Sequence, residues 1–414
     1  MTGIEVHISL GGEQIRVGTL FRQAARGRES VTFQYHENWL IHPARFSLEP
    51  GLAVGKGMFH PGDGREMFGS IGDSAPDTWG RRLMQRAERR AARRENRAPQ
   101  TLHEADFLLG VSDVSRLGAL RFRRAGDETF QKPAGEGVPS FLRLGSLLGS
   151  AQRIERNEET DEDLSLIFAP GSSLGGARPK ASVADTAGAL AIAKFPRDTD
   201  EYSVETWEHI ALLLAGQAGI RVPRHELHRV GDKPVLLSWR FDRDGAARIP
   251  FLSAMSMLQV KDGDRASYPE IVDELSRHGA MARADAAELF RRMVFNILVS
   301  NVDDHLRNHG FLWAGRTGWR LSPAYDLNPT PTDLKTRILT TNISLDEGTC
   351  SIELALSQAE LFGLSPGDAK AIVTEVGRAV AGWRSIARQT GQTESQIDRM
   401  ASAFEHEDLT LANA

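Results

Sequence analysis

The residues best suited to chemistry lie close together near position 305. Asp303 and Asn308 are five positions apart, and Asp326 follows beyond two short apolar stretches. Sites of phosphoryl transfer use an Asp and an Asn at this spacing, followed by a later Asp. One Asp accepts the proton of the attacking hydroxyl, and the Asn and the later Asp offer the hard oxygen ligands that Mg²⁺ prefers. The spacing of Asp303, Asn308 and Asp326 is therefore compatible with a phosphoryl-transfer site.

The flanking segments favour that interpretation over chance. Apolar residues recur every three to four positions through 289–298, which predicts a buried helix running directly into the loop. The segments 310–313 and 319–321 flank a turn at 314–318, which predicts a hairpin. Helix, acidic loop, hairpin and Asp follow one another in the C-terminal lobe of protein kinases. The alternative is a solvated loop between a helix and a hairpin, because Asp, Asn and His are common turn residues.

A stretch rich in glycine and serine, 171–181, contains Lys180. Its backbone N–H groups could approach phosphates closely, and Lys180 could reach toward them. The stretch does not match the Walker pattern, because Pro179 precedes the lysine and Ala181 follows it. A surface turn is the alternative.

A second lysine, Lys194, lies inside the apolar strand predicted at 190–196. Burying an unpaired ammonium is costly, so this lysine needs partners. Kinases give such a lysine the α- and β-phosphates and a helix glutamate. We choose Glu208, in the helix predicted at 204–218, because it lies deeper in that helix than Glu205. An edge-strand lysine reaching water is the alternative.

Another apolar strand, 234–243, becomes polar toward its end. It is suited to the hinge between two lobes, where backbone groups from Trp239 to Phe241 could meet adenine. A plain core strand with a polar exit is the alternative.

Composition limits the function classes. The chain has 414 residues, enough for two or three domains, and 41% hydrophobic with 25% charged residues is ordinary for a globular protein. A formal charge of −5 does not favour a polyanion-binding surface over the whole molecule. Cys350 is the only cysteine, which excludes an intrachain disulfide and agrees with a reducing compartment. With no long apolar run, we expect a cytoplasmic protein without membrane contact.

The first 125 residues begin with predicted strands and continue into a helix from Thr78 that carries eight arginines between Arg81 and Arg97. This run could contact nucleic-acid phosphates or an acidic partner. A solvated helix face with local ion pairs is the alternative, and the more common one. Residues 126–140 have the composition of a linker, and we expect the acidic stretch 155–163 to be exposed.

Several segments, taken in order, resemble the HipA-like serine/threonine kinases, toxins of bacterial type II toxin–antitoxin pairs. They are Ser74–Leu83 (SAPDTWGRRL), Ser173–Lys180 (SLGGARPK), Ala193–Pro196 (AKFP), Arg240–Arg243 (RFDR), Asp303–Asn308 (DDHLRN) and Pro323–Asp326 (PAYD). The resemblance covers almost the whole chain and implies an α+β, bilobal protein-kinase-like fold. Residues 1–125 would be an extra N-terminal subdomain, 126–248 the β-rich N-lobe and 249–414 the helical C-lobe.

Position by position, the resemblance implies Asp303 as catalytic base, Asn308 and Asp326 as Mg²⁺ ligands, and Lys194 as the lysine that holds the α- and β-phosphates of ATP. The remaining nucleotide-binding positions would be Leu174, Gly175, Gly176, Ala177, Lys180, Trp239, Phe241, His305 and Arg307. Ser173 matches the family's inhibitory autophosphorylation serine. Two positions depart from the family: Asp304 replaces a common Gly, which puts the loop backbone in doubt, and Trp239 replaces the commoner hinge Glu.

The resemblance also implies a function. It is that of an ATP- and Mg²⁺-dependent toxin kinase whose target is an aminoacyl-tRNA synthetase, often the glutamyl enzyme. A HipB-like helix-turn-helix antitoxin would bind both the kinase and operator DNA. Two alternatives remain open: a small-molecule kinase, and a non-enzymatic co-repressor scaffold beside a DNA-binding partner.

Overall fold

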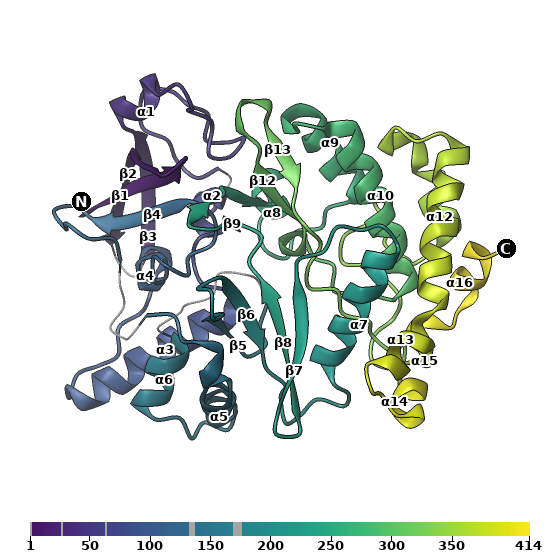
Figure 1. Cartoon of the computed structure of the whole chain (residues 1–414). Helices are drawn as coiled ribbons and strands as arrows, with labels where there is room; N and C mark the ends of the chain where they lie inside the picture. The colour runs from purple at the N-terminus through teal and green to yellow at the C-terminus, as the bar shows by residue number, and fades with distance from the viewer. Residues whose placement is uncertain (1, 26–27, 63, 132–136, 169–175) are drawn as a thin grey trace. The chain divides into compact units, whose positions relative to one another are not determined.

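The computed structural model describes residues 2–25, 28–62, 64–131, 137–168 and 176–414. The chain forms two compact units, the first made of residues 1–199 and 228–252 and the second of residues 200–227 and 253–414 (Figure 1). Strands β7 (His225–Val230) and β11 (Phe251–Ser253) lie where the chain passes between the units. The boundaries predicted at 125 and 248 stay predictions.

The described part of the first unit contains two four-stranded sheets, a two-stranded sheet of β9 and β10, and several helices. Its elements are β1 (Thr2–Leu10), β2 (Glu13–Ala25), β3 (Arg28–Tyr35), α1 (Glu37–Ile41), α2 (Gly69–Gly72), α3 (Thr78–Arg94), α4 (Glu104–Gly110), β4 (Leu120–Arg124), η1 (Phe141–Arg143), α5 (Leu144–Glu155), α6 (Asp161–Phe168), β5 (Lys180–Ala184), β6 (Leu190–Lys194), β8 (Lys233–Trp239), β9 (Arg243–Asp244) and β10 (Ala247–Arg248).

The N-terminal sheet has the order β3-β2-β1-β4. Ile4, Val6 and Ile8 are fully buried on one face of β1, as the alternation of apolar and polar residues in the sequence predicts. The ladder between β1 and β2 shifts register between Val6 and His7.

The second sheet has the order β5-β6-β8-β7, and helices α3, α5 and α6 share its apolar core. Trp79 and Leu83 of α3 are buried in this core with residues of β5, β6 and β8. Helix α3 begins as the sequence predicts, because the side chain of Asp77 accepts a hydrogen bond from the backbone N–H of Gly80 at 2.8 Å.

The arginine-rich helix and the acidic stretch pair with each other. Arg86 contacts Glu159 at 3.0 Å, and Arg90 and Arg94 both contact Asp161. The expectation that the acidic stretch is exposed throughout is wrong at Asp163. That carboxylate is buried and accepts hydrogen bonds from Ser150, Arg153 and Thr160, and these lower its pKa despite burial.

The second unit is mainly helical. Its elements are α7 (Val204–Gln217), α8 (Ala254–Met257), α9 (Tyr268–His278), α10 (Ala282–Leu298), η2 (Leu306–Asn308), β12 (Gly310–Trp313), η3 (Gly315–Thr317), β13 (Trp319–Leu321), α11 (Ile352–Ser357), η4 (Ala359–Phe362), α12 (Pro366–Ala381), α13 (Trp383–Gln389), α14 (Glu394–Arg399), α15 (Ala401–Phe404) and α16 (Glu407–Ala412).

Helix α10 lies at the centre of this unit and packs against α9 and α12 (Figure 1). It buries Leu289, Phe290, Met293, Ile297 and Leu298, so the periodic pattern identified it correctly. The predicted hairpin forms between β12 and β13, with Phe311 opposite Leu321.

Two other helices show where local signals hold and where they fail. Helix α7 ends before Gly219, which adopts a left-handed backbone with φ 76°, as predicted. Ile372, Val376 and Val380 lie on the buried side of α12, but the same apolar spacing continued to Trp383 does not mark one helix, because α12 ends at Ala381 and the buried Trp383 begins α13. No helix in the described part of the chain is long and apolar enough to cross a membrane.

Candidate active site

The loop after α10 places Asp303 and Asn308 together. The side-chain Nδ2 of Asn308 donates to the backbone oxygen of Asp303 at 3.1 Å, while the Asp303 carboxylate is 56% exposed. The other end of the Asn308 amide, Oδ1, is buried and has no hydrogen-bond partner among the described residues. A buried carbonyl oxygen without a partner is unusual and fits a metal ligand.

Asp326 follows the hairpin in a strained conformation. Its φ is 59°, in the left-handed region that residues other than glycine rarely adopt. Such strain concentrates at functional sites, where surrounding contacts enforce it. The neighbouring Tyr325 donates its hydroxyl to the backbone oxygen of Arg307 at 2.6 Å, which ties the segment of Asp326 to the loop of Asn308.

Asp304 is a structural anchor. It is buried and is not among the residues with positive φ, so the loop does not need the glycine common in the family. Its oxygens accept hydrogen bonds from the Tyr268 hydroxyl at 2.7 Å and from the backbone N–H groups of Thr340 and Thr341 at 2.9 and 3.2 Å. These contacts join the loop to α9 and to the segment after Asp326.

Burial sets the protonation of the groups around this anchor. Desolvation raises the pKa of Asp304 to about 8, although the hydrogen bonds that it accepts act in the opposite direction. Desolvation also lowers the pKa of the buried His309 to about 3. His309 Nε2 lies 3.3 Å from the backbone oxygen of Asp304, so a neutral imidazole supports the loop from within.

In the first unit, Lys180 and Lys194 lie opposite each other on β5 and β6. Like charges on directly opposed residues repel, so this pair favours an anionic group nearby. Asp77 supplies one such group, because its Oδ2 lies 3.0 Å from the Nζ of Lys180 and both side chains are buried. Gly176, with φ 100°, is so close to Lys180 that a Cβ there would lie 2.9 Å from Nζ. Of the predicted phosphate loop, Ser173, Leu174 and Gly175 lie outside the described residues.

The predicted hinge is tied into the second sheet. The indole N–H of Trp239 donates to Asp185 at 3.0 Å, and the backbone N–H of Arg240 donates to Leu190. Phe241 lies against Phe251, with the ring centroids 6.3 Å apart.

The charged residues after the hinge have a structural role that the motif did not reveal. Arg240 and Arg243 both pair with the fully buried Asp242, whose Oδ2 also accepts a hydrogen bond from the backbone N–H of Gly118 at 2.6 Å. This network holds the loop that precedes β4 against the strand end.

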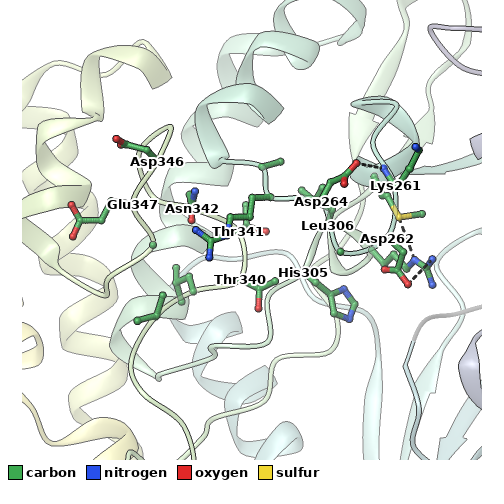
Figure 2. A pocket seen from close by; sticks show the side chains of 18 of the residues that line it. Lys261, Asp262, Asp264, His305, Leu306, Thr340, Thr341, Asn342, Asp346 and Glu347 are labelled. Carbon is green, nitrogen blue, oxygen red and sulfur yellow. Dashed lines mark hydrogen bonds and ion pairs between the residues drawn. The ribbon is translucent and has the colours of Figure 1, made fainter. Parts of the chain in front are cut away.

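Ala177 lies in the first unit, and its backbone oxygen accepts a hydrogen bond from Arg197. The other remaining predicted positions lie in the second unit. Glu205 and Glu208 of α7 are both buried, so burial does not distinguish them as the partner of Lys194. His305 and Arg307 line a cavity of about 580 Å³ together with residues 261–266, 338–342 and 346–349 (Figure 2). Arg307 contacts Asp262 at 3.4 Å in this cavity.

Two residues at the site had no distinct signal in the sequence. Lys335 Nζ lies 3.5 Å from Asp303 Oδ1, although the two residues are far apart in the chain. Asn328 donates from Nδ2 to Asp326 Oδ1 at 3.1 Å. Asn328 stands two positions after Asp326, a closeness that could have drawn attention to it, whereas nothing local marks Lys335.

Comparison with known proteins places this chain in a family. Residues 172–383 match the model of the HipA-like C-terminal domain. HipA of Shewanella oneidensis MR-1, solved with HipB and its operator DNA, is similar over 99% of this chain and 96% of that chain, with a TM-score of 0.72 and 16% identity. Y4dM of Sinorhizobium fredii, named as a kinase, is 37% identical over 94 residues, which is 22% of each protein. These likenesses confirm the α+β, kinase-like fold.

Proposed function

Because the chain belongs to the HipA-like family, we propose that it is an ATP- and Mg²⁺-dependent protein serine/threonine kinase that acts as a growth-inhibiting toxin. The observation that carries the proposal is the buried Oδ1 of Asn308, which finds no hydrogen-bond partner in the described part of the chain. It lies beside Asp303, in a loop tied to the segment of a strained Asp326. A purely structural loop would not need such an unsatisfied amide oxygen beside an exposed carboxylate.

In the proposed reaction, Asp303 accepts the proton of a seryl hydroxyl while the seryl oxygen bonds to the γ-phosphorus of ATP. The bond to the leaving ADP oxygen breaks. Asn308 and Asp326 would hold Mg²⁺, which neutralises charge on the phosphates when bound. Lys194, with Glu208 as its proposed partner, would hold the α- and β-phosphates. The other residues proposed to contact the nucleotide are Leu174, Gly175, Gly176 and Ala177 of the phosphate loop, together with Lys180, Trp239, Phe241, His305 and Arg307.

The proposed partners come from the family. The Shewanella HipA was solved with HipB and operator DNA. By analogy, we propose that this chain binds a HipB-like antitoxin, which makes most of the contacts to DNA. An aminoacyl-tRNA synthetase is the proposed protein substrate, and Ser173 the proposed autophosphorylation site.

The deciding experiment is intact-mass analysis with peptide mapping after incubation with Mg-ATP. We expect the wild-type protein to gain phosphate and Asp303→Asn to gain none, because loss of a positioned base costs about 10²–10⁴ in rate. Asp273→Asn, which changes an exposed carboxylate on α9, is the matched control and should behave as wild type.

The outcomes separate the alternatives. Equal phosphorylation of wild type and Asp303→Asn would contradict the role of Asp303. Nucleotide binding without any phosphorylated protein, but with a phosphorylated metabolite, would favour the small-molecule kinase. No nucleotide binding at all would favour the non-enzymatic scaffold.

A further inference from the structure

Asn328 is held in place from several directions. Its backbone N–H donates to Oδ1 of Asn301 at 3.1 Å, and its carbonyl oxygen accepts a hydrogen bond from the Thr330 hydroxyl at 3.2 Å. The backbone N–H of Thr330 donates in turn to Ser300 at 3.1 Å. The segment after Asp326 is therefore fixed to the residues that precede the catalytic loop.

A buried chain of amides continues from that contact. Asn301 donates to Asn296 Oδ1 at 3.0 Å, and Asn296 donates to the Tyr268 hydroxyl at 2.9 Å. Tyr268 then donates to Asp304, the residue next to the proposed base. Asn296, Asn301 and Asp304 are nearly inaccessible to solvent, so each hydrogen bond is expensive to lose. The chain connects the metal-binding segment to the catalytic loop by a route that avoids the solvent-exposed carboxylate of Asp303.

The contact from Asn328 to Asp326 differs from an ordinary turn. In an Asx turn, the aspartate oxygen accepts from the backbone N–H two residues on. Here Asn301 already takes that N–H, and the side-chain amide of Asn328 donates to Asp326 Oδ1 instead. The Oδ1 atom of Asn328 is itself buried and has no partner among the described residues.

We propose that Asn328 is a positioning residue for the metal-binding carboxylate, an inference that rests on the proposed kinase function. Its amide fixes one oxygen of Asp326, which stands on a strained backbone, and so orients the carboxylate toward the cation. Groups that orient a ligating carboxylate typically contribute 10–100-fold to metal affinity.

Binding of Mn²⁺ in the presence of ADP, measured by electron paramagnetic resonance, tests the inference without any protein substrate. Asn328→Leu keeps the size of the side chain and removes the donor, whereas Asn328→His keeps an N–H near the position of Nδ2. We expect Asn328→Leu to weaken Mn²⁺ binding about 10–100-fold and Asn328→His to recover part of the loss. Metal-free ADP affinity and melting temperature should stay unchanged, which a merely structural role would not predict. Asn413→Ala, an exposed amide on the C-terminal segment, is the control.

Equal Mn²⁺ affinity in wild type and a folded Asn328→Leu would overturn the inference and leave the kinase proposal intact. If Asn328→Leu does not fold, Asn328→His is compared with Asn328→Ala. Equal Mn²⁺ affinity of these two variants would overturn the inference. Wild-type protein that binds no Mn²⁺ with ADP would instead contradict the proposed function on which the inference rests.

Discussion

At the scale of single residues, Asp304 makes the sharpest prediction. Its pKa of about 8 in the folded protein exceeds the usual value of 3.8 because the carboxyl is buried. Between about pH 4 and 8 the folded state keeps a proton that the unfolded state loses, so the free energy of unfolding falls as the pH rises. One such proton gives a slope of up to about 1.4 kcal/mol per pH unit.

Asp304→Asn removes that proton from the balance. We expect the free energy of unfolding of the variant to lose this component of its pH dependence. At pH 8 the variant should gain stability relative to wild type, because its amide oxygen can still accept hydrogen bonds from Thr340 and Thr341. Urea unfolding at pH 5, 6.5 and 8 measures the slope, with Asp273→Asn as control. An identical slope in wild type and Asp304→Asn would show that Asp304 is ionised throughout.

At the scale of elements, the start of α3 is joined to the start of β5 by the buried pair of Asp77 and Lys180. Removing one partner of a buried ion pair typically costs about 3–5 kcal/mol, since the other charge stays buried. We expect Lys180→Met to destabilise the nucleotide-free protein by about this amount. Asp77→Asn should act similarly while its amide oxygen still caps α3.

The double variant distinguishes a structural lysine from one that serves nucleotide alone. Asp77→Asn with Lys180→Met should be more stable than the sum of the single changes predicts, because no charge is left unpaired. Arg388→Met, which breaks an exposed ion pair with Glu394, is the control and should change little. Unchanged nucleotide-free stability in Lys180→Met would mean that the pair does not hold α3 to β5.

At the scale of the whole molecule, charge is balanced in a way that bears on DNA binding. The net charge is −5, and the arginines of α3 that face the acidic stretch are already paired. Arg82, Arg89 and Arg93 form an exposed stripe on the same helix. We expect these three arginines to contribute little to DNA binding, because the antitoxin is proposed to make most of the contacts to DNA.

The salt dependence of binding to a duplex DNA tests this. Each phosphate contact contributes about 0.9 to the slope of log affinity against log salt. We expect the protein alone to bind weakly and the triple change of Arg82, Arg89 and Arg93 to Gln to alter the slope by less than about 1. A decrease of about 3 would identify α3 as a DNA-contacting helix, and Arg384→Gln, at an arginine paired with Glu405, is the control.

The sequence by itself determined the elements whose signals are local. The spacing of apolar residues predicted α10, the turn at 314–318 predicted the hairpin, and the helix predicted from Thr78 is α3. Asp303, Asn308 and Asp326 could be singled out because a loop and a hairpin fix their separation along the chain. Such patterns depend on neighbours within a few residues, which the sequence displays directly.

Only the tertiary structure decided which distant residues meet. It placed Lys335 beside Asp303, paired Asp77 with Lys180, set the acidic stretch against the arginine helix, and joined Asn328 to Asp304 through buried amides. It also gave Asp326 its left-handed backbone. These partners depend on how the chain folds back on itself. Amide, carboxylate and lysine side chains are also common on protein surfaces. The residues next to them in the sequence therefore do not indicate which distant partner they contact.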